Sequence, residues 1–321
     1  MYLSGHKWKY IINFYSHAIA LVHKIKIASK LKEIVDRHGK ENIVFYSYWF
    51  TAWTFILCVL KCRLKEISIV TRAHGGDLYE ERAKPYGYFP FRSFQMSMIN
   101  KIAVVSGFGK NYLAEKYPRF SGKIIVSRCG VSDNGTNPKN KIQPALRLVS
   151  CSSLVALKRV HLIIDILKHI TIETEWIHFG GGALLESLKE QAKKLPSNIK
   201  AVFKGSVLKK EIISFYKNNP VDFFIHVSQT EGIPFSIMEA ISFGIPVIAS
   251  GVGGVPEIVN EKTGILIPAD FRPAETAALI IRNYEMGKNS SVNRNEVKNY
   301  WQHNFNADDN YEYFVRNILL G

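Results

Sequence analysis

Cysteine is scarce in this chain of 321 residues, and the four cysteines, Cys58, Cys62, Cys129 and Cys151, include no Cys-x2-Cys pair. The missing pair argues against a zinc site built from cysteines. The spacing of Cys58 and Cys62 places both on one face of a helix, and we interpret them as reduced, buried thiols. Reduced thiols favour a cytoplasmic location.

Acidic residues are outnumbered as well. The sequence has 42 Lys and Arg against 27 Asp and Glu, which gives a net charge of +15. Residues 1–32 contain no acidic residue, and their lysines accompany apolar residues at helical spacing. Two interpretations of this predicted basic helix stay open: a packed helix with a solvated lysine edge, or a helix on the anionic inner face of a membrane. No recognisable DNA- or RNA-binding motif accompanies the charge, so we expect no nucleic-acid partner.

Long apolar runs and nucleotide fingerprints are missing too. The uncharged stretch Ile43–Leu60 is interrupted by Ser47, Thr51 and Thr54. It therefore predicts a buried strand over Ile43–Trp49 and a helix over Thr51–Lys61 instead of a membrane span. The amino terminus lacks the features of a signal peptide. The triplet Gly180–Gly182 does not extend to Gly-x-Gly-x-x-Gly, which excludes the dinucleotide fingerprint.

Short apolar strands alternate with helices in the second half of the chain. The predicted strands are Leu146–Cys151, Glu175–Phe179, Lys200–Phe203, Asp222–Val227, Pro246–Ala249 and Gly264–Ile267. The predicted helices are Val160–Ile170, Ala183–Leu195, Lys210–Lys217 and Phe235–Phe243. This α/β alternation predicts a parallel sheet covered on both faces, which binds ligands at the carboxyl ends of its strands.

The first half shows a weaker version of the same alternation. Its further strands are predicted over Ile67–Thr71, Ile102–Val105 and Lys123–Val126. The polar, turn-rich stretch Asp133–Pro144 is the best candidate for a linker. From about Asn293 the chain is predicted to be helical. Together these features predict two Rossmann-like domains with parallel sheets facing across a cleft.

The segment Gln229–Ala240 predicts an anion site. A strand ends at Ser228, a glycine-containing turn follows, and Pro234 stands where a helix should begin. Backbone N–H groups at this helix start, those of Ile233, Phe235, Ser236 and Ile237, would converge with the helix dipole on a pyrophosphate. One carboxylate precedes the site, Glu231, and another follows it, Glu239. A nucleoside diphosphate sugar offers hydroxyl groups at both ends of its diphosphate, which fits this layout.

The spacing Glu-x7-Glu of Glu231 and Glu239, with Gly-Ile-Pro and Ser-Ile-Met-Glu-Ala between, resembles the donor motif of family 4 retaining glycosyltransferases of the B-type, two-Rossmann fold (GT-B). The following segments also match, in order: Gly244–Ala249, Gly253–Glu257 and Thr263-Gly264. Thr71–Tyr79 resembles the His-Gly motif of the family's amino domain. The resemblance covers about residues 40–315. Within Thr71–Tyr79, Asp77 is predicted to cap the next helix.

The resemblance implies an acceptor-side domain over 1–143, a donor-binding Rossmann domain over 144–292, and carboxyl-terminal helices over 293–321 that return toward the amino domain. It implies catalytic roles for Glu231, His74 and Lys158. The implied donor-binding residues are Glu239, Gly232, Ile233, Pro234, Phe235, Ser236, Ile237 and Val207. The family's second phosphate-binding residue, an arginine, falls on Ser153, and Arg159 is expected to replace it.

The expected activity is retaining transfer of a sugar from a nucleoside diphosphate sugar to a lipid-linked or polysaccharide acceptor, in polysaccharide biosynthesis. No Asp-x-Asp stands at a strand end, so neither a divalent metal nor another cofactor is expected. The family's amino domain opens with a strand, a glycine loop and a helix, which are absent here, so the amino domain is expected to be incomplete. The alternative is a truncated, inactive nucleotide-sugar-binding protein that acts as an interaction partner.

Overall fold

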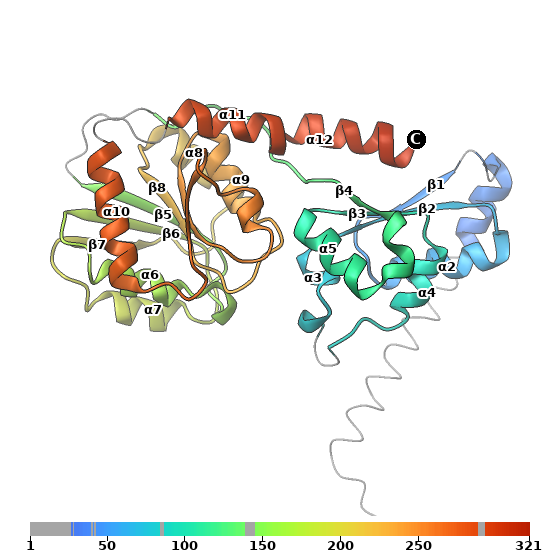
Figure 1. Cartoon of the computed structure of the whole chain (residues 1–321), viewed down its shortest axis with the longest axis horizontal. Coiled ribbons are helices and arrows are strands. Elements are labelled where there is room, and N and C mark those ends of the chain that lie inside the picture. Colours follow the sequence, from blue (N-terminus) through green and yellow to red (C-terminus); the bar gives the residue numbers. More distant parts are fainter. Residues whose placement is uncertain are drawn as a thin grey trace, which may run out of the picture. The chain divides into compact units, whose positions relative to one another are not determined.

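The computed structural model describes residues 27, 29–39, 41, 43–83, 87–138, 145–287 and 293–321. The chain forms two compact units (Figure 1). The first unit contains the described residues up to Val105, together with Lys110–Val126 and Phe314–Gly321. The second contains Ser106–Gly109 and Ser127–Tyr313. Most of the predicted basic helix over residues 1–32, and residues 139–144 of the predicted linker, lie outside the described residues.

The first unit is built on a four-stranded parallel sheet in the order β1-β2-β3-β4. Its strands are β1 (Val44–Ser47), β2 (Ser68–Ala73), β3 (Lys101–Val104) and β4 (Ile124–Val126). The helices are α2 (Ala52–Leu64), α3 (Gly75–Leu78), α4 (Arg92–Met98) and α5 (Gly107–Lys116). Side chains of α2, α4 and α5 form one apolar core with the strands. Phe314 and Ile318 pack on the strands in a second, smaller cluster.

The stretch Ile43–Leu60 therefore forms a strand and a helix, as its interrupted apolar pattern predicts. Within the described residues, no helix combines the length and the apolar character needed to cross a membrane. Cys58 of α2 is buried, but Cys62 is exposed, so the prediction of a buried thiol is wrong at Cys62. The four residues from Cys58 to Cys62 advance the helix by about 400°, so Cys62 lies about 40° around the axis from Cys58. This position is outside the buried face that contains Leu57, Leu60 and Leu64.

The second unit contains a six-stranded sheet in the order β10-β9-β8-β5-β6-β7, with parallel pairing throughout. Its strands are β5 (Leu146–Cys151), β6 (Thr174–Phe179), β7 (Ile199–Phe203), β8 (Phe223–His226), β9 (Val247–Ser250) and β10 (Gly264–Ile267). The helices are α6 (Val160–Leu167), α7 (Leu185–Ala192), α8 (Lys209–Asn218), α9 (Phe235–Ser242), α10 (Pro273–Gly287), α11 (Arg294–Phe305) and α12 (Ala307–Tyr313). A π-helical segment, Phe314–Leu319, follows and belongs to the first unit.

Helices cover both faces of this sheet, which confirms the predicted doubly wound arrangement (Figure 1). On one face, α6, α7 and α10 share a single apolar core with the strands. On the other, Phe215 of α8 packs against Phe179 of β6, with ring centroids 5.1 Å apart. Helix α11 lies beside α9.

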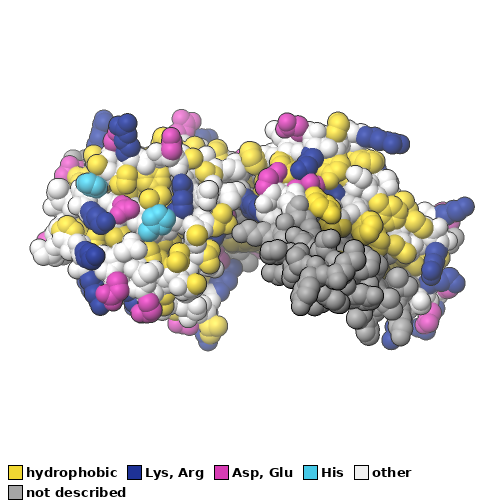
Figure 2. Space-filling model, turned by 90° about the horizontal axis from the view of Figure 1, so that it is seen from below, with side chains coloured by type: hydrophobic (Ala, Val, Ile, Leu, Met, Phe, Trp, Pro, Cys, Tyr) yellow, Lys and Arg dark blue, Asp and Glu magenta, His cyan; other side chains and the backbone are white. Residues whose placement is uncertain are grey.

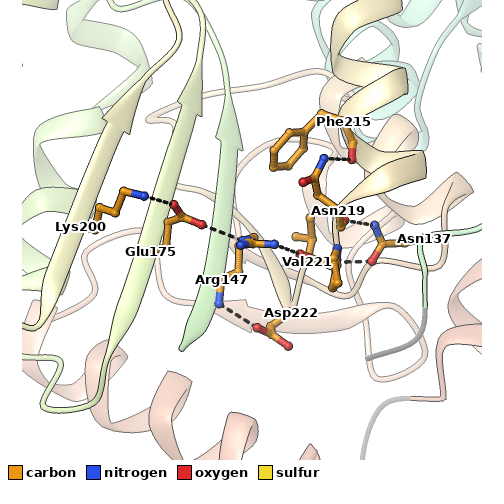
Figure 3. Close-up of polar contacts among 9 residues, drawn as sticks. Asn137, Arg147, Glu175, Lys200, Phe215, Asn219, Val221 and Asp222 are labelled. Atoms are coloured by element: carbon orange, nitrogen blue, oxygen red, sulfur yellow. Dashed lines mark hydrogen bonds and ion pairs between the residues drawn. The ribbon is translucent and has the colours of Figure 1, made fainter. Parts of the chain in front are cut away.

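A polar chain joins the amino ends of the strands, at the edge opposite their carboxyl ends (Figure 3). Arg147 Nε donates to Glu175 Oε2 at 2.9 Å, and Lys200 Nζ lies 2.8 Å from Glu175 Oε1. The backbone N–H of Arg147 donates to Asp222 Oδ2 at 2.7 Å. Burial raises the pKa of Glu175, but the hydrogen bonds and charges of Lys200 and Arg147 outweigh it and lower the pKa. These contacts link β5, β6, β7 and the start of β8.

Asn137, inside the predicted linker, is buried in the second unit. Its amide nitrogen donates to the carbonyls of Tyr216 and Asn219, at 2.6 and 2.8 Å. Its amide oxygen accepts from the N–H of Val221 at 3.0 Å (Figure 3). Because a buried amide left unpaired is costly, these bonds fix residues just after the first unit to the second.

Candidate functional site

The strand order places the predicted donor residues at one point of the second sheet. From β5 the chain runs outward through β6 to β7, then crosses back to β8 and continues to β9 and β10. The loops after β5 and β8 therefore flank the place where the direction reverses, and open α/β sheets bind ligands there. The first loop carries Lys158 and the second carries Glu231. A backbone bond joins them, because the N–H of Gln229 donates to the carbonyl of Leu157 at 2.9 Å.

The two predicted catalytic residues of this sheet are in direct contact. Lys158 Nζ forms an ion pair with Glu231 Oε1. His226, the last residue of β8, places its Nε2 3.0 Å from the same oxygen. Glu231 Oε2 makes no hydrogen bond with the described residues. One carboxylate oxygen is thus held by two nitrogens, and the other is left for a ligand.

The electrostatics of this cluster keep Glu231 ionised. Its side chain is only 11% exposed. Burial raises the pKa of Glu231, but the hydrogen bond from His226 and the charges of His226 and Lys158 outweigh burial, and the pKa falls to about 2. The carboxylate is therefore negative at neutral pH.

Helix α9 begins where the sequence predicts. Pro234 is its N-cap, and Phe235–Ser242 are helical. The N–H of Ile237 donates to the Pro234 carbonyl at 3.2 Å, so this predicted phosphate-facing group already has a partner. The described residues provide no acceptor for the N–H groups of Phe235 and Ser236. The first turn of α9 therefore keeps two donors and the positive end of its dipole for an anion.

Two glycines support the turn before α9. A Cβ on Gly253, whose φ is +56°, would lie 2.0 Å from the carbonyl oxygen of Glu231. A Cβ on Gly254 would lie 2.3 Å from the carbonyl oxygen of Gly232. Only glycine allows these backbones to approach so closely. The Gly253-Gly254 pair thus fixes the position of Glu231 and Gly232 from behind.

Glu239, in the middle of α9, has a cationic partner from a neighbouring helix. Lys209 Nζ lies 2.9 Å from Glu239 Oε1, and the two side chains are 63% and 12% exposed. The field of Glu239 also reaches Cys151 at the end of β5. Burial and, to a smaller extent, the charge of Glu239 raise the pKa of the Cys151 thiol to about 11, while the charge of Lys158 opposes the shift. Lys158, Cys151 and Glu239 therefore share one neighbourhood.

Arg159 and Val207 differ from the rest of the predicted set. Arg159 adopts the left-handed conformation, with φ +48°. Its guanidinium donates to the carbonyls of Val227, Ser228 and Ala269, at 2.8, 3.1 and 2.9 Å. These bonds give Arg159 a structural task, and its phosphate role stays a prediction. Val207 is half-buried in the loop between β7 and α8, two residues before Lys209.

His74 follows β2 in the first unit, at the carboxyl edge of that sheet. Its side chain is buried, and neither ring nitrogen has a hydrogen-bond partner among the described residues. Burial and, to a smaller extent, the charge of Arg72 lower the pKa of His74 to about 4, so the ring is neutral at pH 7. Asp77 does not precede a helix, as predicted, but is the third residue of α3, where its Oδ1 accepts from the N–H of the N-cap residue His74 at 2.5 Å.

Residues 136–300, just over half of the chain, match the family described as glycosyl transferases group 1. The chain belongs to this family. The match covers β5 to β10 and the cluster of Lys158, Glu231 and Glu239.

Solved structures show the same fold as this group 1 glycosyltransferase. The apo form of the lipopolysaccharide outer core galactosyltransferase WaaB superposes with a TM-score of 0.73 and 14% identity, over 93% of this chain and 81% of that one. Anabaena HepE in complex with UDP-glucose gives a TM-score of 0.71 and 17% identity, over 90% of this chain and 80% of that one. The predicted class, α/β with two Rossmann-like domains of the GT-B type, is confirmed.

Among curated relatives, Protein CapJ of Staphylococcus aureus is 27% identical over 183 residues, which are 54% of this chain and 45% of CapJ. The chain therefore spans less than half of the length of that relative.

Sequence reasoning missed His226, which contacts Glu231, and Lys209, which forms an ion pair with Glu239. His226 ends an apolar strand, where a lone histidine gives no signal, and Lys209 is one of several surface lysines. Over the described residues, no group of three or more His, Cys, Asp or Glu side chains is arranged to hold a metal ion.

Proposed function

We propose that this chain transfers a sugar from a nucleoside diphosphate sugar, and that the donor binds at the carboxyl edge of the second unit's sheet. The observation that carries the proposal is the contact of Lys158 and His226 with Glu231, at the point where the sheet reverses. The first turn of α9 offers N–H groups to the diphosphate. HepE, which shares the fold, was solved with UDP-glucose.

Lys158 and Glu231 would exchange partners when the donor arrives. The diphosphate takes the Lys158 ammonium, and Glu231, still ionised, accepts hydrogen bonds from the hydroxyl groups of the donor sugar. During transfer the bond between the anomeric carbon and the phosphate oxygen breaks. Lys158 and the α9 N–H groups stabilise the charge that develops on that oxygen, as preorganised donors do. No metal ion is needed for this step.

The stereochemical outcome that we propose is retention. The acceptor oxygen forms its bond to the anomeric carbon on the face that the phosphate leaves, through an oxocarbenium-like state. The proton of the acceptor hydroxyl passes to the departing phosphate oxygen, so no covalent protein nucleophile is required. Glu231, which binds the hydroxyl groups of the donor sugar in this proposal, takes no part in proton transfer.

Glu239 would hold the ribose diol. A carboxylate accepts from two adjacent hydroxyl groups at once, and Lys209 occupies only Oε1 of Glu239. Val207, close to Lys209 in sequence, would meet the base through its backbone. We further propose a lipid-linked or polysaccharide acceptor in polysaccharide biosynthesis, at the inner face of the membrane. WaaB, which shares the fold, is a lipopolysaccharide outer core galactosyltransferase by its name.

The test combines thermal shift with turnover. UDP, GDP, ADP and their sugars are screened, and the nucleotide that binds raises Tm by mass action. With that nucleotide, Glu239→Ala is expected to weaken binding about tenfold or more, because it removes charge-assisted hydrogen bonds. Lys158→Met and Glu231→Gln are expected to lower kcat about 10²–10³-fold.

Matched controls come from the end of α7, which leads to the amino end of β7. Glu190 of α7 and Lys193, which follows the helix, form an exposed ion pair, and Lys193→Met and Glu190→Gln should leave both readouts unchanged. Near-normal turnover in Lys158→Met and Glu231→Gln would overturn the proposal. Nucleotide binding without transfer to any acceptor would instead support a binding protein.

A further inference from the structure

Two exposed aromatic rings stand beside His74 at the carboxyl edge of the first sheet. Tyr48 and Trp49, which follow β1, are 43% and 48% exposed. The ring centroid of His74 lies 4.8 Å from that of Tyr48 and 4.4 Å from that of Trp49. The centroids of Tyr48 and Trp49 are 5.8 Å apart. We call these three residues the aromatic platform. Since β1 and β2 are neighbours, their loops bring it together.

The backbone that carries the platform is held rigidly. The carbonyl of Trp49 accepts from Ser47 Oγ at 2.7 Å and from Thr54 Oγ1 at 3.0 Å. Asp77 joins the two loops, because its carboxylate accepts from the N–H of Phe50 at 2.6 Å as well as from that of His74. A surface that is held in place before binding loses little entropy when a ligand arrives.

His74 gives a second and independent sign of a ligand. Both of its ring nitrogens are buried and have no partner in the described part of the chain. Burial of such a group without a hydrogen bond costs about 1–3 kcal/mol. A neutral imidazole presents one donor and one acceptor, and a hydroxyl group can serve either. The cost is relieved by a ligand whose hydroxyl reaches His74 past the exposed rings.

We propose that the aromatic platform binds the acceptor and that the acceptor presents a pyranose ring there. The C–H face of a pyranose is weakly positive and apolar, and it stacks on the negative face of an indole or phenol ring. Its hydroxyl groups satisfy the His74 nitrogens, which an alkyl chain cannot do. The inference rests on the proposed transferase function and adds the chemical class of the acceptor and two residues, Tyr48 and Trp49, that recognise it.

The experiment uses the full chain and methyl α- and β-pyranosides of glucose, galactose, mannose and N-acetylglucosamine. Saturation-transfer NMR should show contact with the ring protons of at least one glycoside. Trp49→Ala and Tyr48→Ala are each expected to weaken that contact about tenfold. Trp49→Phe, which keeps an aromatic face, should retain most of it. Trp53→Ala is the control, because Trp53 is 50% exposed and lies outside the platform.

Each failure has a distinct meaning. The platform proposal is overturned if no glycoside binds the unmodified chain, if binding survives in both alanine variants, or if UDP, GDP or ADP displaces the glycoside. It is also overturned if the alanine variants lose binding to anionic lipid vesicles instead, because that would assign the rings to a membrane. Failure of the proposed transferase function would appear separately, as the absence of any nucleotide-dependent rise in Tm.

Discussion

One carboxylate oxygen of Glu231 is shared between Lys158 and His226. A charge held this way in a nearly buried site depends on its partners, because removal of either leaves the other charge poorly compensated. Glu231→Gln keeps the shape and one carbonyl acceptor but removes the charge. The variant therefore isolates the electrostatic contribution.

The stability of the chain should depend on pH through Glu231. Its pKa in the folded chain, about 2, lies below the ordinary value of 4.5. The ionised group therefore stabilises the fold above pH 4.5, and this contribution is lost as the pH falls from 4.5 toward 2. At pH 7 we expect Glu231→Gln to lower the free energy of unfolding by about 3 kcal/mol. The difference from the unmodified chain should shrink steadily as the pH falls below 4.5.

Denaturant unfolding at a series of pH values measures this difference. Glu190→Gln provides the baseline, since an exposed ion pair contributes only about 0–1 kcal/mol. A difference between Glu231→Gln and the unmodified chain that stays constant from pH 7 to pH 3 would contradict the prediction.

At the residue scale, the sequence indicates Glu231 and Glu239 because their spacing is local. A turn and one short helix fix both positions, so seven intervening residues are enough to predict them. The residues that contact these side chains could not be predicted in the same way. Lys209 reaches Glu239 from another helix, and Tyr48 and Trp49 reach His74 from the loop after another strand. Such contacts depend on sheet order and register, which the local pattern does not contain.

Among the elements, the strands were predictable because short apolar runs alternate with helical segments and are bounded by turn residues. Leu146–Cys151 and Gly264–Ile267 match β5 and β10 residue for residue. Helix α10 was not predicted. Ala277 and Ile280 of that helix are fully buried, and Ile281 and Tyr284 pack against the same core. This spacing of i, i+3, i+4 and i+7 is a helical signal that sequence reasoning overlooked, and Pro273 at the first helical position was a second one.

The polar chain at the amino edge of the second sheet should stabilise the fold without touching the donor site. Glu175 accepts from both Arg147 and Lys200, and hydrogen bonds to charged groups contribute about 1.5–3 kcal/mol each. We expect Glu175→Ala to lower the free energy of unfolding by about 2 kcal/mol. The nucleotide-induced shift in Tm should be unchanged, because the donor residues follow the opposite ends of the strands.

Glu173→Ala is the matched control, because Glu173 is exposed and lies two residues away. Its effect on stability should stay within about 0.5 kcal/mol. Loss of the nucleotide-induced shift in Glu175→Ala, with the fold intact by circular dichroism, would contradict the separation of the two edges.

At the scale of the whole molecule, the observed division after Val126 precedes the turn-rich stretch that the sequence marks as a linker. Composition indicates where a chain turns, but the buried amide of Asn137 decides with which unit the stretch packs. The net charge is a property of the same scale. On the face seen in Figure 2, Lys and Arg side chains are scattered among Asp and Glu side chains and form no continuous stripe.

The net charge is +15, and the face in Figure 2 carries no basic stripe. We therefore expect the acid-free residues 1–32 to contribute to binding of an anionic surface. Each lysine near an anionic bilayer contributes about 1 kcal/mol to binding. Replacement of Lys24, Lys26 and Lys30 by glutamine should therefore weaken sedimentation with phosphatidylserine-containing vesicles about a hundredfold at low salt. Raised salt should weaken binding of the unmodified chain in the same direction, because screening shortens the reach of surface charge.

A matched triple variant separates local charge from net charge. Lys189, Lys193 and Lys194, replaced by glutamine, lower the net charge by the same amount from within the second unit. If the two triple variants bind vesicles equally weakly, the effect belongs to the overall charge and residues 1–32 have no special part. If only the first variant loses binding, while duplex DNA binds neither it nor the unmodified chain, the acid-free segment is the membrane contact, and an acceptor embedded in that membrane becomes the natural substrate.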